Sequence, residues 1–282
     1  MALANSEGMM KTLKRLSNQI YRIFFGNRHF YKFNQKLVEL GLRGLGFLNT
    51  RSVYISGEAA FIKKIFKQNA IPTILDVGGN DGEYAKCIRR FLPNAELLSF
   101  EPNPSAFRAL QQASQRFGYQ AFNIGLSCAR GKKILYDDAG SEGHPCATFH
   151  IESFRELSRQ PYREVMVEVD TLDHIVEMLK IKKIDLLKID TEGHEFDVLC
   201  GAKESIASGI IQRIQFEYSF INSYLRRTLR DFQSLLPGYR LMRILPNGDA
   251  MPLSTEPAYM RELYAFHNII AYHEEAHLSS YP

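Results

Sequence analysis

The chain has 282 residues, of which 45% are hydrophobic and 23% are charged, and these ordinary globular proportions exclude a disordered or fibrous protein. The formal net charge is +4, but residues 1–50 carry +6 and the remainder carries −2, so only the N-terminal segment is basic. There is no run of eighteen apolar residues, and the four scattered cysteines form no C-x-x-C pair. We therefore expect no membrane span, zinc knuckle or disulfide framework, and a cytoplasmic location.

Residues 1–57 are predicted to form a basic, helical N-terminal segment. Apolar residues recur at helical spacing in two stretches, and residues 26–28 form the break between them. Basic and aromatic residues interleave in residues 11–48, which is typical of a segment that docks on a membrane surface. Two interpretations remain open: a helix pair packed on the main domain, or a peripheral contact with a membrane or a partner. The apolar positions are Leu13, Leu16, Ile20, Ile23, Phe24, Phe33, Leu37, Leu40 and Leu42.

Residues 58–275 are predicted to form one α/β domain, with residues 276–282 as a C-terminal tail. Apolar strands alternate with helices, which indicates a mostly parallel sheet covered on both faces. The alternation is interrupted at about residues 131–170, where two strand-like pieces flank a polar stretch and predict a hairpin-like insertion. The predicted helices are 58–68, 83–91, one that opens after residue 104, 195–206 and 222–236. The predicted strands are 73–77, 96–100, 120–124, 132–136, 164–169, 184–189, 211–217, 239–245 and 263–271.

A glycine-rich turn follows the first strand of this domain, at residues 76–84 (DVGGNDGEY). Glycine lets a ligand approach the backbone closely, and the helix that follows presents free N–H groups. The turn lacks the Lys-Ser/Thr of a phosphate loop and the later glycines of a dinucleotide fingerprint. Its acidic residues favour a ligand with a positive amino group, such as S-adenosylmethionine, over a phosphate. Glu101 ends the next strand, where a carboxylate can accept hydrogen bonds from both ribose hydroxyls.

From about residue 71 to residue 272 the chain resembles the FkbM family of class I S-adenosylmethionine-dependent methyltransferases. The resemblance implies a seven-stranded Rossmann-like fold with a reversed last strand, and O-methylation of a sugar or a secondary metabolite. The matching motifs are DVGGNDGEY at 76–84, FEPNP at 100–104, NIGLS at 123–127, VDTLD at 169–173, KIDTEGHE at 188–195, VLCGA at 198–202 and FEY at 216–218. The cofactor-binding residues that it implies are Asp76, Gly78, Gly79, Asn80, Asp81, Gly82, Glu101, Asn103 and Asn123.

Methyl transfer to a hydroxyl oxygen requires alignment of donor and acceptor and a base that removes the hydroxyl proton. Asp190 is the first candidate, because it follows an apolar strand at the edge of the sheet where ligands bind. Glu217 ends the neighbouring strand and is expected to support it. Glu192 and His194 are further catalytic candidates, although both could instead cap the following helix. Lys188, inside the buried strand, is expected to pair with one of these acids.

A metal remains an alternative at two places. Asp190 and Glu217 could together hold a divalent ion, but we favour catalysis without a metal. The stretch from His144 to His150 also contains Cys146, yet its spacing matches no common zinc pattern, and we favour a loop on the substrate side.

Two other functions compete with methylation of a small hydroxylated molecule or a glycan. An RNA methyltransferase would explain the basic N-terminal segment, but the rest of the chain is net acidic and contains no nucleic-acid module. A non-catalytic scaffold that binds the cofactor or a membrane would not need the carboxylates at 190, 192 and 217. The sequence leaves the acceptor and the oligomeric state open.

Overall fold

A computed structural model describes residues 2–50, 52–67, 70–140, 143, 145–158 and 160–274. By its internal contacts the chain divides into two units, Met1–Leu45 and Gly46–Pro282. Residues 46–57, which the sequence analysis grouped with the N-terminal segment, thus lie in the large unit. Phe47 shows why: its side chain is fully buried, and its ring meets the His267 ring at 4.6 Å between centroids.

The small unit consists of two helices joined by a tight turn, as the break at residues 26–28 predicted. They are α1 (Ala2–Phe25) and α2 (Tyr31–Gly44), with the 3-10 turn η1 (Arg28–Phe30) between them. Asn27 caps η1, since its side chain accepts a hydrogen bond from the His29 N–H at 3.0 Å. Asn34 Nδ2 donates to the Phe25 carbonyl at 2.9 Å and so ties the second helix to the end of the first. Among the described residues, no helix is both long enough and apolar enough to cross a bilayer.

The large unit is built on an eight-stranded sheet with the order β10-β9-β11-β8-β7-β1-β2-β3. The five strands from β8 to β3 run parallel, and β11 runs antiparallel to both of its neighbours. The expected Rossmann-like fold with a reversed last strand is therefore confirmed, and β10 adds an eighth strand at one edge. The strands are β1 (Thr73–Val77), β2 (Glu96–Phe100), β3 (Gln120–Phe122), β7 (Leu186–Ile189), β8 (Arg213–Tyr218), β9 (Tyr239–Ile244), β10 (Ala250–Pro252) and β11 (His267–His273).

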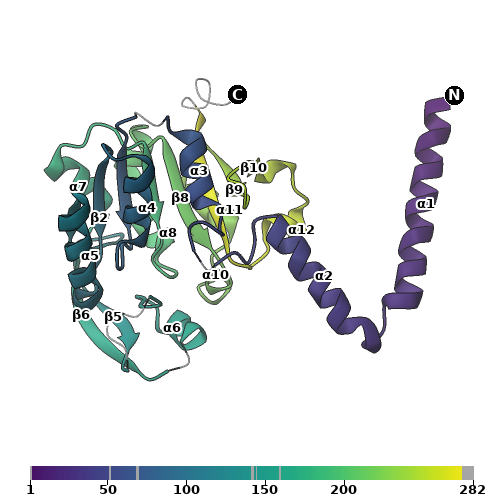
Figure 1. Cartoon of the computed structure of the whole chain (residues 1–282), viewed down its shortest axis with the longest axis horizontal. Helices are drawn as coiled ribbons and strands as arrows, with labels where there is room; N and C mark the ends of the chain where they lie inside the picture. Colours follow the sequence, from purple (N-terminus) through teal and green to yellow (C-terminus); the bar gives the residue numbers. More distant parts are fainter. Residues whose placement is uncertain are drawn as a thin grey trace. The chain divides into compact units, whose positions relative to one another are not determined.

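Helices cover both faces of this sheet (Figure 1). Side chains of α3 and α4 form one apolar cluster with residues such as Ile74 and Ile270, and those of α7, α8, α9 and α11 form another with Leu75 and Phe216. Because Ile74 and Leu75 are successive strand residues, their side chains point to opposite faces, and the two clusters lie on either side of the sheet. The helices are α3 (Glu58–Ile65), α4 (Glu83–Phe91), α5 (Pro104–Phe117), α7 (Leu172–Leu179), α8 (Glu195–Cys200), α9 (Lys203–Ala207), α10 (Ile221–Tyr224), α11 (Leu229–Leu235) and α12 (Ala258–Arg261), with a short 3-10 turn, η2 (Leu253–Thr255).

Two helices that the periodicity predicted as continuous are each divided. The helix expected at 195–206 is divided at Gly201, where a Cβ atom would lie 2.0 Å from the Ser127 carbonyl oxygen. The helix expected at 222–236 is divided because Thr228 and Asp231 form a capping box that begins a new helix, α11.

The insertion forms a small second sheet with the order β4-β6-β5, at one end of the main sheet (Figure 1). Strands β5 (Gly131–Asp138) and β6 (Tyr162–Asp170) pair antiparallel, as the predicted hairpin requires, and β4 (Gly125–Leu126) pairs parallel with β6. The polar stretch between β5 and β6 contains a helix, α6 (Ile151–Leu157), which the sequence analysis did not predict.

Candidate active site

A cavity of about 510 Å³ opens where the parallel strands β1, β2, β7 and β8 end. This is the edge of an open α/β sheet at which ligands bind, and the volume lies in the range of small-molecule sites. Its walls come from the strand ends, the chain before α3 and the insertion. The lining residues used below are Ser56, Glu58, Gly78, Asn80, Glu101, Asn103, Pro145, Ala147, Phe149, Asp190, Glu192 and Glu217.

The glycine turn brings the ends of β1 and β7 into close contact. Gly78 has a φ of +86°, and a Cβ atom there would lie 1.7 Å from the Asp190 carbonyl oxygen, so only glycine fits. Asn80 also takes a positive φ, of +44°, a conformation that asparagine tolerates better than most residues. The turn therefore places the backbone of residues 78–80 directly beside the residue that follows β7.

Glu101 lies in the cavity wall and is held by the backbone around it. Its two carboxylate oxygens accept hydrogen bonds from the N–H groups of Asn80 at 2.9 Å and Asn103 at 2.8 Å. Burial raises the pKa of Glu101 to about 7, and the two N–H groups oppose that rise. Each oxygen has a second lone pair with which it can accept a hydrogen bond from a ligand hydroxyl.

The structure brings four of the nine predicted cofactor residues to the cavity: Gly78, Asn80, Glu101 and Asn103. The other five, Asp76, Gly79, Asp81, Gly82 and Asn123, do not line it.

Two of these five support the cavity from behind. Asp76 is fully buried and accepts a hydrogen bond from Ser99 Oγ at 2.8 Å. Asn123 Nδ2 donates to the Glu101 carbonyl at 2.8 Å and so positions that strand end. Asp81 instead lies at the surface, with a 55% exposed side chain 3.5 Å from Lys86.

The buried Lys188 lies between Asp76 of β1 and Asp190, which follows β7. The sequence analysis predicted that this lysine would pair with an acid. Its Nζ lies 3.1 Å from Asp190 Oδ2 and 3.5 Å from Asp76 Oδ1, and 4.6 Å from the centroid of the Tyr84 ring. Burial opposes the charge of Lys188, but Asp190 and Asp76 outweigh it and raise the Lys188 pKa. The ammonium group therefore stays charged beside Asp190. Of the paired acids, only Asp190 reaches the cavity, with its side chain 41% exposed.

Glu192 and Glu217 line the same cavity as Asp190, so three of the four predicted catalytic residues come together. Burial, and then the charge of Asp190, raise the pKa of Glu192 to about 8. Burial, and then Glu192 and Asp190, raise the pKa of Glu217 well above its usual range. Glu192 also has a φ of +51°, a left-handed conformation that costs a glutamate about 1–3 kcal/mol. Such strain and such pKa shifts are concentrated at functional sites.

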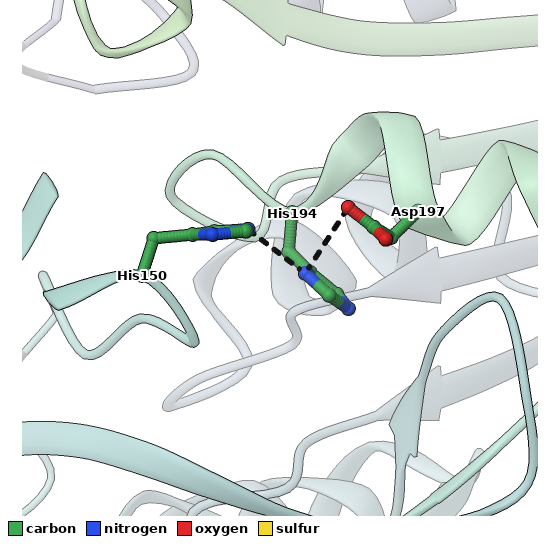
Figure 2. A group of neighbouring side chains, drawn as sticks. All are labelled: His150, His194 and Asp197. Atoms are coloured by element: carbon green, nitrogen blue, oxygen red, sulfur yellow. Dashed lines mark hydrogen bonds and ion pairs between the residues drawn. The ribbon is translucent and has the colours of Figure 1, made fainter. Parts of the chain in front are cut away.

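His194, the fourth predicted catalytic residue, does not line the cavity. Its ring is fully buried, with Nε2 2.9 Å from Ser127 Oγ and Nδ1 3.1 Å from His150 Nε2. Figure 2 shows His150, from the chain before α6, and Asp197, from the first turn of α8, directed at the same edge of the His194 ring. Burial also lowers the pKa of His194 well below its usual range. This placement does not suit a base that acts on a molecule in the cavity.

The sequence analysis missed a buried polar group behind the carboxylates. Glu58 lines the cavity, and its two oxygens accept hydrogen bonds from Ser56 Oγ at 2.5 Å and Gln215 Nε2 at 2.6 Å. Burial raises the pKa of Glu58, and Lys188 opposes that rise. Gln215 was the available signal, because an amide within the apolar strand 211–217 requires a buried partner.

Within the described part of the chain, three side chains with metal-ligand atoms come within 4.8 Å of one another at one place, formed by His150, His194 and Asp197. This group includes neither Asp190 nor Glu217.

Comparison with known proteins agrees with this geometry. A family model for the methyltransferase FkbM domain matches residues 76–253. The chain is 29% identical over 187 residues to the 2-O-methyltransferase NoeI of Sinorhizobium fredii, across 63% of this chain and 76% of the relative. It is 31% identical over 167 residues to methyltransferase 1 of Beauveria bassiana, across 50% and 64%. It is 29% identical over 157 residues to the hexuronic acid methyltransferase AglP of Haloferax volcanii, across 55% and 60%.

The sheet order, the glycine turn and the acidic strand ends define a Rossmann-like methyltransferase. The family match covers more than half of the chain, and the chain therefore belongs to the FkbM methyltransferase family.

Proposed function

We propose that this enzyme transfers a methyl group from S-adenosylmethionine to a hydroxyl of a sugar or a related hydroxylated metabolite. The observation that carries the proposal is a single cavity that joins the glycine turn and Glu101 to the carboxylates Asp190, Glu192 and Glu217. The relatives named for 2-O-methylation and for a hexuronic acid support a hydroxyl acceptor of the sugar type.

The residues around the glycine turn suit this donor. Glu101 would accept hydrogen bonds from the ribose hydroxyls, and the backbone at Gly78 and Asn80 would lie against the amino-acid portion. Asn103 is 1% exposed, and its Nδ2 has no hydrogen-bond partner among the described residues. A buried donor of this kind calls for an acceptor, which a ring nitrogen of adenine would supply. When bound, S-adenosylmethionine would provide the methyl group on its sulfonium.

In this proposal Asp190 takes the hydroxyl proton of the acceptor. Lys188 places its charge 3.1 Å from Asp190, whereas burial and the neighbouring carboxylates raise the pKa of Glu192 to about 8 and raise that of Glu217. The two glutamic acids would therefore donate hydrogen bonds to acceptor oxygens and hold the reacting hydroxyl beside Asp190. As methyl transfer proceeds, the O–H bond breaks and its proton passes to the carboxylate of Asp190.

The test is methyl transfer from isotopically labelled donor to a panel of neutral hexoses, deoxyhexoses, uronic acids and aglycones, with mass spectrometry to locate the new methyl group. We expect label on oxygen. Label on nitrogen or on RNA, or no transfer to any hydroxylated acceptor, would contradict the proposal. If Asp190 and Glu217 instead held a metal, a divalent ion required for activity would be lost in the Glu217→Gln variant.

We also propose that the small unit docks the enzyme on an anionic membrane surface. The side chains of Leu13, Leu16, Ile20, Ile23 and Phe24 are 47–66% exposed and, at 100° per residue, share one face of α1. Lys14, Arg15 and Arg22 lie on the opposite face. An exposed apolar stripe opposite a basic face is the pattern of a helix that lies in the membrane interface.

Vesicle flotation tests this proposal with the full chain. Vesicles with anionic lipid should carry the wild type, and zwitterionic vesicles should carry much less. Replacement of Ile20 and Ile23 by serine should abolish flotation, whereas the same replacements at Asn18 and Gln19, outside the apolar stripe of α1, should not. Equal flotation of the two double variants would contradict an interfacial helix.

A further inference from the structure

Three potential ligand atoms converge behind the cavity wall, where the insertion meets the start of α8. His194 Nδ1 lies 3.1 Å from His150 Nε2 and 3.7 Å from Asp197 Oδ2. His150 immediately precedes α6, and His194 and Asp197 lie at the beginning of α8 (Figure 2). The histidines are 44 residues apart in the sequence, so the fold alone brings them together.

One tautomer of His194 places its Nδ1 lone pair toward the other two groups. In this tautomer the N–H at His194 Nε2 donates to Ser127 Oγ, 2.9 Å away, and Ser127 Oγ can in turn donate to Cys128 Sγ at 3.9 Å. In neutral histidine only one ring nitrogen carries hydrogen, and Nδ1 is then unprotonated.

This arrangement places two electron-rich atoms, His194 Nδ1 and Asp197 Oδ2, next to each other with only the His150 ring to supply a hydrogen. The His150 ring can donate its one hydrogen to either His194 Nδ1 or Asp197 Oδ2. The atom that receives no hydrogen then faces the lone pair of the other acceptor. A cation between the three groups would satisfy all of them. The hydrogen bond from His194 Nε2 to Ser127 is the outer contact that metal-binding histidines commonly make.

We propose that His150, His194 and Asp197 bind a divalent transition-metal ion of the zinc class, with water completing the coordination. Two imidazole nitrogens and one carboxylate oxygen are a known zinc ligand set. Nitrogen ligands about 2.0–2.1 Å from a tetrahedral zinc lie about 3.3 Å apart, close to the 3.1 Å separation here. The side chain of Asp197 is 23% exposed, which provides a path for the ion.

Such an ion would fasten the insertion to the methyltransferase core. Phe149, next to His150, lines the cavity and meets the His194 ring at 4.6 Å between centroids. Thr148 Oγ1 also donates to the Glu192 carbonyl at 2.8 Å. The bound metal would hold residues 148–150 in place and with them one wall of the cavity. The role of the metal ion is structural, and this role does not depend on which acceptor the enzyme methylates.

Two cations near the cluster limit the affinity that we expect. Lys133 opposes a positive charge at both histidines, and Arg227 opposes one at His150. Zinc should therefore bind in competition with these charges.

The experiment titrates zinc chloride into metal-free, full-length protein by calorimetry, with cobalt absorption as a spectroscopic readout of nitrogen ligation. The wild type should bind one zinc ion per chain. His150→Gln and Asp197→Asn should each weaken binding by more than about 100-fold, beyond the 10–100-fold typical of an outer contact. His174→Gln is the matched control, because His174 pairs with Asp170 at 2.8 Å but belongs to no such cluster among the described residues.

A second readout separates binding from misfolding. Zinc should raise the melting temperature of the wild type and of His174→Gln and should slow proteolysis of the insertion, with neither effect in the two cluster variants. Glu217→Gln should keep the zinc ion. An absence of zinc binding in the wild type, unchanged binding in both cluster variants, or loss of the ion in Glu217→Gln would overturn the proposal. If zinc binds as expected and no acceptor is methylated, only the proposed function fails.

Discussion

The carboxylates in the two halves of the cavity have different kinds of neighbours. On the side of β1 and β2, Glu101 accepts hydrogen bonds from two backbone N–H groups that the folded chain holds in place. On the side of β7 and β8, Asp190, Glu192 and Glu217 line the cavity together, and Lys188 lies 3.1 Å from Asp190. Backbone groups do not titrate, whereas facing carboxylates compete for protons. The first half is suited to holding a ligand, and the second half to exchanging a proton.

The largest expected effect concerns the proton-exchanging half. Asp190→Asn keeps the shape of the side chain and removes its basicity, so turnover should fall by about 10²–10⁴-fold while donor affinity is nearly retained. Single-turnover kinetics combined with calorimetry of donor binding would separate the two quantities. A parallel loss of stability and donor affinity would show that Asp190 has a structural role. Near-wild-type turnover would indicate that Glu192 is the base.

In the ligand-holding half, a substitution should lower donor affinity more than turnover. Glu101→Ala removes charge-assisted hydrogen bonds worth about 1.5–3 kcal/mol, so calorimetry should show donor affinity lowered by about 10–150-fold. Turnover at saturating donor should change much less than in the Asp190 variant. Unchanged donor affinity would show that Glu101 does not bind the cofactor. It would also contradict the contrast between the two halves.

The raised pKa of Glu192 predicts how stability depends on pH. The folded chain holds this proton up to a pKa of about 8, whereas the unfolded chain releases it at about 4.3. The proton therefore favours the folded state at low pH, and that contribution is lost as the pH rises from about 4.5 through 8. Glu192→Gln cannot lose the proton, so its free energy of unfolding should fall less between pH 5 and pH 8 than that of the wild type. Denaturant titrations at both pH values measure this, and parallel pH dependences would contradict the raised pKa.

The smallest effect is expected at Asp81, which the glycine motif marked as a cofactor residue. Its exposed side chain pairs with Lys86 at the surface, and such pairs contribute only about 0–1 kcal/mol. Asp81→Asn should therefore change donor affinity by less than about threefold. A loss as large as that of Glu101→Ala would show that the bound donor reaches beyond the cavity wall seen here.

Where a prediction depended on local pattern, the sequence was sufficient. The strands at 73–77 and 96–100 and the helix at 83–91 have the predicted bounds, because a buried parallel strand and an amphipathic helix each have their own periodicity. The motif also located Asp190 and Glu101 at the ends of β7 and β2, the strands on either side of β1, since the carboxyl ends of parallel strands share one edge of the sheet. The division of the helix at 195–206 could not be read in this way; it falls at Gly201, beside the Ser127 carbonyl of a distant segment.

The sequence by itself thus determined the class of fold, the edge of the sheet that carries the site, and the chemical type of the groups there. Only the tertiary structure decided which of those groups reach the cavity: Asp190 does, while Asp76 is buried behind it and Asp81 lies outside. It likewise directed His194 away from the cavity and toward His150. The physical reason is that spacing along the chain fixes the face of a strand or the turn of a helix, whereas burial, pKa and ligand geometry are set by groups that arrive from distant segments.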